Sequence, residues 1–270
     1  MNALVGEKLS IITYKAQTTR HRIMGIINGA DFQIVYSDTP GFVRSAYRLH
    51  DSMNEVIREA ISDADIFILV IDVKDKRDPD PAAMERLKHT KTPLIIVLNK
   101  TDLVKQDFLF PLAEKWQAIF PNAEIVPVSS LKGKNVATVF DLVKRFLPEH
   151  PTYYEKDELT TRTTRFFVAE MIREKIYLHT EQEIPYASEV VIEKYSEEES
   201  IDRISATIYV ERDTQKSILI GKGGAMLKKI GTEARLDMEE FLSKKVFLEL
   251  FVKVDKDWRN NNLKLKKFGY

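Results

Sequence analysis

The sequence predicts an α/β protein with two domains, the first built on a mostly parallel β-sheet and the second of the α+β class. In the first half, short and almost continuously apolar segments alternate with segments of helical spacing, which is typical of parallel strands covered by helices on both faces. After a proline-containing break, the order of elements changes. A length of 270 residues also fits two domains.

The composition excludes several classes of protein. The chain has no cysteine, which rules out a disulfide scaffold, a cysteine-rich zinc site and a thiol nucleophile. Its longest apolar runs, Ile66–Val73 and Pro93–Leu98, have the length of strands and are too short to span a bilayer. The start, Met1–Ser10, lacks the charged and apolar regions of a signal peptide. We therefore expect a cytoplasmic protein.

The charges are unevenly distributed although the net charge is zero. Between Glu211 and Tyr270 there are 14 basic and 9 acidic side chains, so this part is positive and the rest is negative by the same amount. This pattern indicates a polyanionic partner for the C-terminal part. Ordinary variation of the surface is the alternative.

The elements of the first half follow from apolar periodicity. We expect strands at His21–Ile27, Phe32–Ser37, Ile66–Val73, Pro93–Leu98 and Glu124–Val128. We expect helices at Arg48–Ile61, Ala82–His89, Gln106–Phe120 and Val136–Phe146. Asn28 and Gly29 are typical of a hairpin turn between the first two strands.

The second half begins after Pro148 and Pro151, which predicts a domain of residues 1–148, a linker of residues 149–163 and a domain of residues 164–270. Here the patterns predict a helix at Thr164–Leu178, strands at Glu189–Tyr195, Ile201–Glu211 and Val246–Val254, and a long helix ending near Leu242. A short segment, Ile218–Ile220, leads into the loop Gly221–Gly224.

Three polar loops follow strands of the first half. The first loop, Asp38-Thr39-Pro40-Gly41, follows the strand Phe32–Ser37; its aspartate can hold Mg²⁺ through water, and its glycine lets the backbone N–H approach a terminal phosphate. A plain turn is the alternative. The carboxyl ends of parallel strands are where open α/β sheets bind ligands.

The second loop is Asn99-Lys100-Thr101-Asp102. A carboxylate at Asp102 can accept hydrogen bonds from guanine N1–H and the exocyclic amine, a donor pair that adenine lacks. The alternative is a polar strand end with a helix cap. The third loop, Ser129–Gly133, has a backbone that can reach the guanine oxygen, but a serine-rich turn is common.

The order of these loops resembles that of the Ras-like GTPases. Lys15–Arg20 then resembles the first switch, which implies Thr19 as a Mg²⁺ ligand beside Asp38, with Thr18 as the second choice. The resemblance implies a GTP site formed by Asp38, Thr39, Pro40, Gly41, Phe42, Asn99, Lys100, Thr101, Asp102, Ser129, Ser130 and Leu131. No catalytic residue is assigned. Phe42 stands where many relatives carry a water-orienting glutamine, so we expect slow hydrolysis.

The loop Gly221-Lys222-Gly223-Gly224 is similar to the G-x-x-G loop of a KH domain, which clamps single-stranded RNA. The order of elements around it is that of the type II KH fold. The site implied is Gly221, Lys222, Gly223, Gly224, Lys228, Lys229, Arg165 and Arg173, with Lys175 nearby. The alternatives are a glycine-rich helix entry without ligand and a solvated helix face with Glu170–Arg173 pairs.

Longer motifs narrow the resemblance. Residues 15–22 read K-A-Q-T-T-R-H-R, residues 165–175 read R-F-F-V-A-E-M-I-R-E-K, residues 220–231 read I-G-K-G-G-A-M-L-K-K-I-G, and the chain ends in F-G-Y. Together with D-T-P-G, these motifs resemble the Era family of bacterial GTPases along the whole chain. The resemblance implies GTP and Mg²⁺ binding, binding of the 3′ end of small-subunit ribosomal RNA, a role in ribosome biogenesis and a monomeric state. It also implies a peripheral membrane contact, to which the basic tail Lys264–Lys267 could contribute.

A G-x-x-x-x-G-K-[ST] loop does not precede the first switch, and Met1–Lys8 resembles the end of the helix that normally follows such a loop. Either the chain is part of a longer protein or it is a shortened protein. In both cases we expect a gap in the sheet where the family has its first strand, and weak binding of GTP. The rival function is a non-catalytic RNA-binding protein with a degenerate GTPase scaffold.

Overall fold

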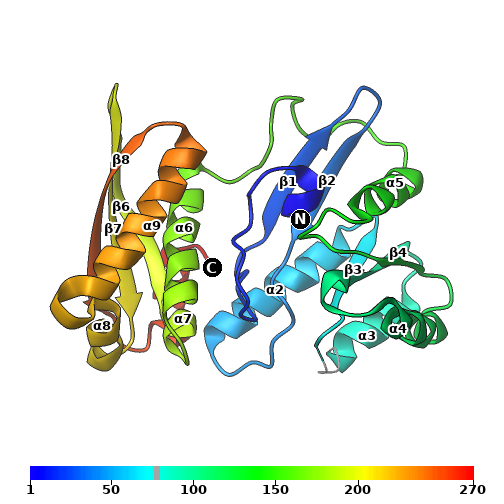
Figure 1. Ribbon diagram of the computed structural model, residues 1–270, viewed down its shortest axis with the longest axis horizontal. Coiled ribbons are helices and arrows are strands. Elements are labelled where there is room, and N and C mark those ends of the chain that lie inside the picture. Colours follow the sequence, from blue (N-terminus) through cyan, green and yellow to red (C-terminus); the bar gives the residue numbers. More distant parts are fainter. Residues whose placement is uncertain (76–79) are drawn as a thin grey trace. The chain divides into compact units, whose positions relative to one another are not determined.

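The computed structural model describes residues 1–75 and 80–270 (Figure 1). By their contacts these residues form two compact units. Unit 1 consists of Met1–Lys8, Arg22–Phe42 and Val56–Thr160. Unit 2 consists of Leu9–His21, Val43–Glu55 and Thr161–Tyr270, so it includes two segments from early in the chain.

Unit 1 has the predicted α/β organisation. Its strands are β1 (Ile23–Asn28), β2 (Gln33–Asp38), β3 (Phe67–Asp72), β4 (Leu94–Asn99) and β5 (Glu124–Pro127). Its helices are α1 (Asn2–Val5), α3 (Pro81–His89), α4 (Gln106–Ile119) and α5 (Val136–Phe146), with a 3₁₀ turn at Thr101–Leu103. Helix α2 (Arg48–Ser62) begins in unit 2 and ends in unit 1.

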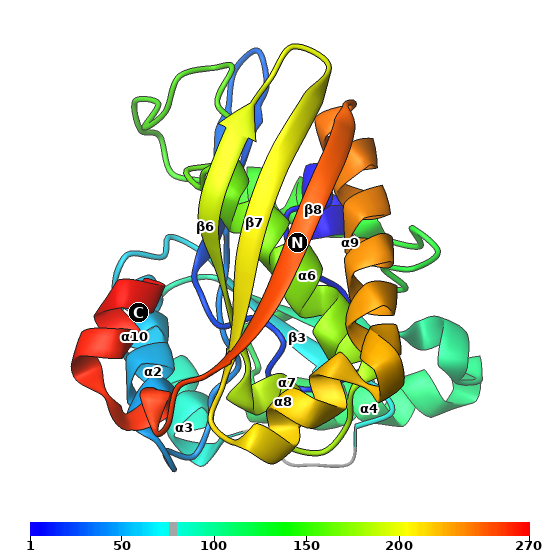
Figure 2. The same cartoon turned by 90° about the vertical axis from the view of Figure 1, so that its left-hand side faces the viewer.

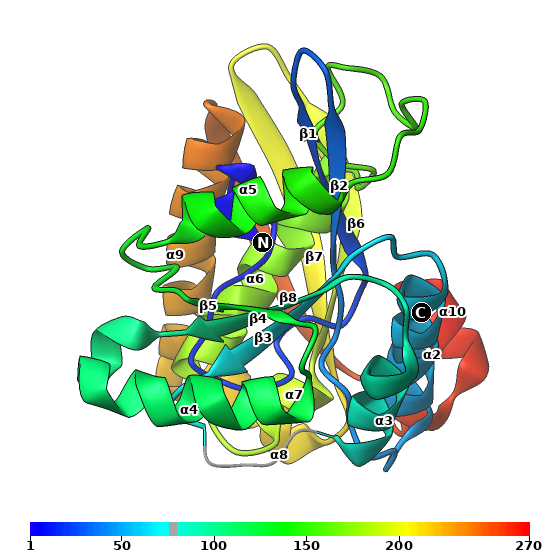
Figure 3. The same ribbon diagram turned by 90° about the vertical axis from the view of Figure 1, so that its right-hand side faces the viewer.

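Strand β4 lies between β3 and β5, and all three run parallel. Its side chains alternate between two cores because successive residues of a strand point to opposite faces. Ile95 and Val97 pack with α5, whereas Leu94, Ile96 and Leu98 pack with α3 and with Trp116 of α4. Helices therefore cover both faces of this sheet, as predicted from its apolar strands (Figure 3).

The sheet of unit 1 is interrupted between β2 and β3. Strand β2 pairs antiparallel with β1, and β3 pairs with β4, so within the described residues these strands form two separate sheets. The side chains of β3 are apolar from Phe67 to Ile71, yet Val70 is 59% exposed. This arrangement agrees with the expected gap in the sheet.

Unit 2 has the predicted order of a type II KH fold. It contains α6 (Thr164–His179), α7 (Ile184–Ala187), β6 (Glu189–Glu197), β7 (Ile201–Val210), α8 (Asp213–Ile220), α9 (Ala225–Leu242) and β8 (Lys245–Val254). Strands β6 and β7 are antiparallel, and β8 is parallel to β7. Helices α6 and α9 cover one face of this sheet (Figure 2), and the core between them includes Ile172, Ile208 and Ile230.

The C-terminal segment adds elements that periodicity did not predict. A 3₁₀ turn at Trp258–Asn260 and helix α10 (Asn262–Phe268) follow β8. Trp258 is fully buried, donates its indole N–H to the Ala187 carbonyl at 3.0 Å, and packs with Leu49 and Met53 of α2. In the described part of the chain, every helix is too short or too polar to cross a bilayer.

Ile96→Ala should lower the free energy of unfolding of unit 1 by about 2–5 kcal/mol, since it leaves a cavity in a core that excludes water. Val70→Ala, one strand away, should cost much less because Val70 is 59% exposed and Ile96 is fully buried. Urea unfolding followed by tryptophan fluorescence checks this, because Trp116 belongs to the same cluster as Ile96. Equal losses for the two variants would contradict the core described above.

Candidate nucleotide and RNA sites

Backbone hydrogen bonds join the two loops that follow β4 and β5. The Val128 N–H donates to the Leu98 carbonyl at 2.8 Å, and the Thr101 N–H donates to the Val128 carbonyl at 3.1 Å. The sheet pairing therefore continues one step beyond the strands. The second and third predicted loops consequently lie together, at the carboxyl edge of the sheet.

Side chains then orient the polar groups of these loops. The Asn99 Oδ1 accepts from both the N–H and the hydroxyl of Ser130, at 3.1 Å and 3.0 Å. The buried Ser129 hydroxyl donates to Asp102 Oδ1 at 2.5 Å. Asp102 itself is exposed. Its carboxylate is thus held from one side and open to solvent, which suits it to accept hydrogen bonds from a ligand.

Lys100 has a partner that the sequence reading missed. Its backbone is left-handed, with φ of 67°, and its Nζ lies 2.6 Å from Asp72 Oδ2. Partial burial opposes ionisation of Asp72, but hydrogen bonds from Lys100 and from the Lys74 backbone N–H, together with the Lys100 charge, outweigh burial and lower the pKa of that carboxyl. Asp72 pairs in register with Asn99, the residue before Lys100, so the parallel alignment of the two strands could have predicted this ion pair.

The loop after β2 is the first of the three predicted loops, and its residues differ in exposure. Asp38 ends β2 and Thr39 is half-buried, whereas Pro40 is buried and Gly41 is exposed. A Cβ added to Gly41 would have no heavy atom within 4 Å, which leaves its amide approachable. Phe42 is 38% exposed.

The predicted first switch lies in unit 2. Thr18 Oγ1 is 2.6 Å from the Thr13 hydroxyl and donates to the Lys15 carbonyl at 2.8 Å, so this hydroxyl is engaged within its own loop. Thr19 is half-buried. Among residues 1–75 and 80–270, no three His, Asp or Glu side chains converge on a possible metal position.

The G-x-x-G loop has the backbone that only glycine adopts readily. Gly221, Gly223 and Gly224 have φ of 73°, 59° and 81°. A Cβ on Gly221 would lie 2.8 Å from the Cβ of Met226, so the loop also packs tightly on α9. The loop opens the long helix α9, whose N-terminus favours anions. Lys222, Lys228 and Lys229 are exposed around it.

Of the two arginines predicted on α6, only Arg165 is exposed. Arg173 is 1% exposed and forms a two-pronged ion pair with Glu170, with Nε to Oε1 at 2.7 Å and Nη2 to Oε2 at 2.5 Å. This structure therefore does not present Arg173 to an RNA, because its side chain is buried and its charge is paired inside unit 2. The alternative of a solvated Glu170–Arg173 pair was right about the pair and wrong about the solvent.

Comparisons with known proteins agree with this geometry. A sequence profile described as "KH domain" matches residues 183–259, and a profile described as "50S ribosome-binding GTPase" matches residues 1–100. The GTPase Era of Syntrophus aciditrophicus is 44% identical over 100% of this chain and 89% of its own length. The GTPase Era of Staphylococcus haemolyticus is also 44% identical, over 100% of this chain and 91% of its own length.

Two solved structures are similar along the whole chain. A crystal structure of Era in complex with MgGDPNP and nucleotides 1506–1542 of 16S ribosomal RNA has a TM-score of 0.94 and 35% identity, covering 100% of this chain and 92% of that one. A structure of an Aquifex aeolicus Era variant bound to GDP·AlF4⁻ has a TM-score of 0.92 and 34% identity, covering 100% and 93%.

His21 is packed between two aromatic rings of unit 2: it stacks on Tyr270 with 4.4 Å between ring centroids and meets Phe166 edge-on at 5.6 Å. The stability of unit 2 should therefore depend on pH through this side chain. Burial lowers the pKa of His21 from 6.5 to about 3; the Glu170 carboxylate opposes this shift and three neighbouring guanidiniums support it. The neutral ring therefore stabilises the fold above pH 6.5, and this contribution is lost as pH falls from 6.5 toward 3.

We expect the His21 Cε1–H signal in an NMR titration to stay at its neutral position down to about pH 4.5. His21→Phe should make unfolding less dependent on pH across the same range, since the ring contacts are kept and the titrating group is removed. Titration of His21 near its ordinary pKa would contradict the burial described here.

Proposed function

The chain belongs to the Era family of GTPases, and on this premise we propose that it is a GTP-binding and GTP-hydrolysing switch whose KH half binds small-subunit ribosomal RNA. The observation that carries the proposal is the paired loop structure after β4 and β5, in which Ser129 orients Asp102 and Asn99 holds Ser130. That arrangement occurs in a chain that also has a complete G-x-x-G loop.

Guanine recognition is assigned to Asp102. One of its oxygens accepts from Ser129 while the carboxylate remains exposed, so it can face the N1–H and exocyclic amine of guanine. Lys100, fixed by Asp72, would lie along the base. Ser130 and Leu131 would border the guanine oxygen, and Thr101 is buried, with its N–H bonded to the Val128 carbonyl.

The phosphates and Mg²⁺ are assigned to the first switch and to the loop that follows β2. Asp38 would hold Mg²⁺ through water and Thr19 would supply a hydroxyl, with the phosphates completing an oxygen shell of the kind Mg²⁺ prefers. The terminal phosphate would lie beside the loop after β2, which is formed by Thr39, Pro40, Gly41 and Phe42. Phe42 has no group that can orient water, so RNA or ribosome contact would have to raise a slow basal hydrolysis.

RNA is assigned to the G-x-x-G loop with Lys222, Lys228 and Lys229, and to Arg165 on α6. The solved Era complex contains nucleotides 1506–1542 of 16S ribosomal RNA, which supports the 3′ end of that RNA as the target. The protein would then act in small-subunit biogenesis in the cytoplasm, as a monomer. A peripheral membrane contact would depend on the basic tail Lys264–Lys267, in which the Lys264 ammonium is already paired with Asp255.

An RNA-binding protein with a degenerate GTPase scaffold is the second candidate. The interruption of the sheet between β2 and β3 favours it. Binding of fluorescent GTP and GDP tests the two against each other, in this chain and in a chimera that carries a G-x-x-x-x-G-K-[ST] segment of the family ahead of Met1. Nucleotide binding by the chimera supports the switch. If both proteins bind a pyrimidine-rich RNA 3′ end and neither binds nucleotide, the scaffold function is correct.

Asp102→Asn should weaken guanine nucleotide binding by at least about tenfold, because an amide cannot accept from both guanine donors. The same change should favour xanthosine nucleotides, whose additional carbonyl can accept from the amide. Fluorescent nucleotide titration of the chimera measures both affinities. The control is Asp107→Asn, an exposed acidic residue in the first turn of α4. Unchanged guanine affinity in Asp102→Asn would remove Asp102 from the site.

Lys222→Ala should weaken RNA binding and reduce the slope of log affinity against log salt by about 1, as expected for one lost phosphate contact. Lys194→Ala is the control, since Lys194 is an exposed lysine on β6 and away from the loop in sequence. Fluorescence anisotropy with a labelled RNA 3′ end at several salt concentrations makes the measurement. Equal effects of the two changes would argue against the G-x-x-G loop as the RNA site.

A further inference from the structure

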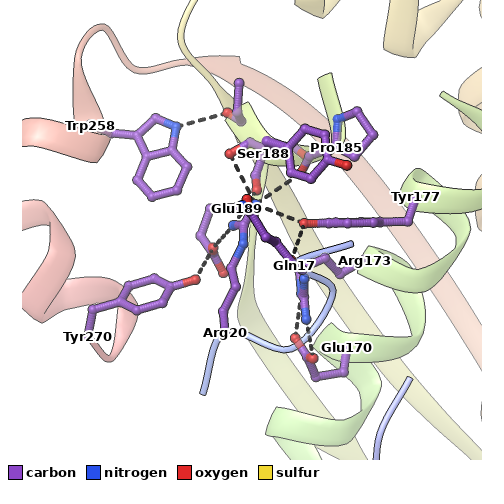
Figure 4. Close-up of polar contacts among 12 residues, drawn as sticks. Gln17, Arg20, Glu170, Arg173, Tyr177, Pro185, Ser188, Glu189, Trp258 and Tyr270 are labelled. Atoms are coloured by element: carbon purple, nitrogen blue, oxygen red, sulfur yellow. Dashed lines mark hydrogen bonds and ion pairs between the residues drawn. The ribbon is translucent and has the colours of Figure 1, made fainter. Parts of the chain in front are cut away.

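Arg20 lies two residues before Arg22 in the motif of residues 15–22. Its side chain is almost completely buried in unit 2, with 3% of its surface exposed. Its guanidinium reaches the junction between α7 and β6 (Figure 4). Nη1 donates to the Ser188 carbonyl at 2.9 Å and to Glu189 Oε2 at 2.8 Å. Nη2 donates to the carbonyls of Pro185 and Tyr186 at 3.0 Å and 3.1 Å.

The junction has the chemistry of a guanidinium receptor. Helix α7 is a single turn that ends at Ala187, so its last carbonyls have no partners within the helix. Three carbonyls and one carboxylate face the two arms of a planar fork, and the Tyr177 hydroxyl stands 3.4 Å from Nη2. A lysine ammonium cannot meet groups spread in this way, because it is a single point charge.

The charge and the closure of the site come from Glu189 and the end of the chain. Glu189 is 5% exposed, and its Oε2 accepts from both Arg20 and the Tyr270 hydroxyl, the latter at 2.7 Å. Burial, together with the Glu189 carboxylate, raises the pKa of Tyr270, which keeps this hydroxyl protonated as a donor. The Tyr270 ring also stacks on His21, the residue after Arg20.

Further contacts hold the rest of residues 9–21 to α6. The Lys15 Nζ donates to the Tyr177 carbonyl at 2.5 Å and to the Thr180 carbonyl, at the C-terminal end of α6. The Tyr177 hydroxyl donates to the Gln17 carbonyl at 3.2 Å. The Ile12 N–H donates to Glu174 Oε2 at 3.0 Å. The segment therefore follows α6 along several residues and ends in the Arg20 site.

We propose that the α7–β6 junction is a guanidinium-binding site and that Arg20 is its ligand, through which the first switch is fixed to the KH half. The site itself stands on the contacts of unit 2 alone. Its regulatory consequence rests on the proposed function. A bound nucleotide that reorders residues 15–22 must either withdraw Arg20 from its site or move the site together with Arg20. The signal then reaches α6 and β6, which belong to the RNA-binding fold.

The test uses the whole chain and chemical rescue. Arg20→Ala should raise hydrogen exchange of the amides in residues 9–21 by at least about tenfold, since several charge-assisted hydrogen bonds are lost. Methylguanidinium at millimolar concentration should restore protection by refilling the site, and methylammonium at the same concentration should not. Arg22→Ala is the matched control, because Arg22 pairs with Asp63 in unit 1.

In the same experiment, hydrogen exchange of the α9 amides reports whether unit 2 remains folded. If Arg20→Ala does not fold, Arg20→Lys is a milder variant. Protection lost in Arg20→Ala and restored only by methylguanidinium supports the site. Unchanged exchange of residues 9–21, or equal rescue by the two cations, overturns it. Because the experiment contains neither nucleotide nor RNA, failure of the proposed function in the binding assays leaves this outcome unaffected.

Discussion

The nucleotide half depends on a constraint at β4, a strand whose apolar side chains are buried on both faces. Such a strand must be covered by helices on each side and paired on each edge. Parallel pairing with β3 and β5 then brings the ends of three strands to the same edge. Asp72, Asn99 and the loop at Ser129 meet there because the register requires it. The polar site is thus a consequence of how the apolar core closes.

In the KH half the corresponding constraint is backbone conformation. Three of the four residues in the G-x-x-G loop have positive φ, and Gly221 also has no space for a Cβ against Met226. Only glycine satisfies both demands, so the backbone geometry explains the glycines of this motif independently of the family resemblance. The same loop begins α9, whose apolar face fills the core with α6. The surface that would receive phosphates is therefore braced by the core of its own domain.

The elements that the sequence predicted best are those whose signal is local. Apolar strands, long amphipathic helices and the glycine loop each carry their pattern within about ten residues. The burial of Arg173 was not predicted because helical spacing carries no sign of it: its ion-pair partner Glu170 and the Tyr177 ring beside it lie on α6 itself, and tertiary packing then encloses them. Helix α10 and Trp258 were missed for the same reason: Trp258 is buried by residues of α2, about two hundred positions earlier. The partner of Lys100 was predictable only from the register of two parallel strands.

The buried Arg20 belongs to residues 9–21, the segment that the proposed switch would reorder. Taking an ion pair out of water costs nearly as much as the pairing returns, so such a pair contributes little net stability, whereas removing one partner is expensive. At Arg20 the cation, the carboxylate of Glu189 and three carbonyls have to meet together, and a shift of one residue along the chain would leave charges unpaired. The contact therefore specifies the position of residues 9–21, and withdrawing Arg20 would leave the Glu189 carboxylate buried without its cation. A bound ligand can displace this resting state only if its binding free energy differs between the two states by at least that cost.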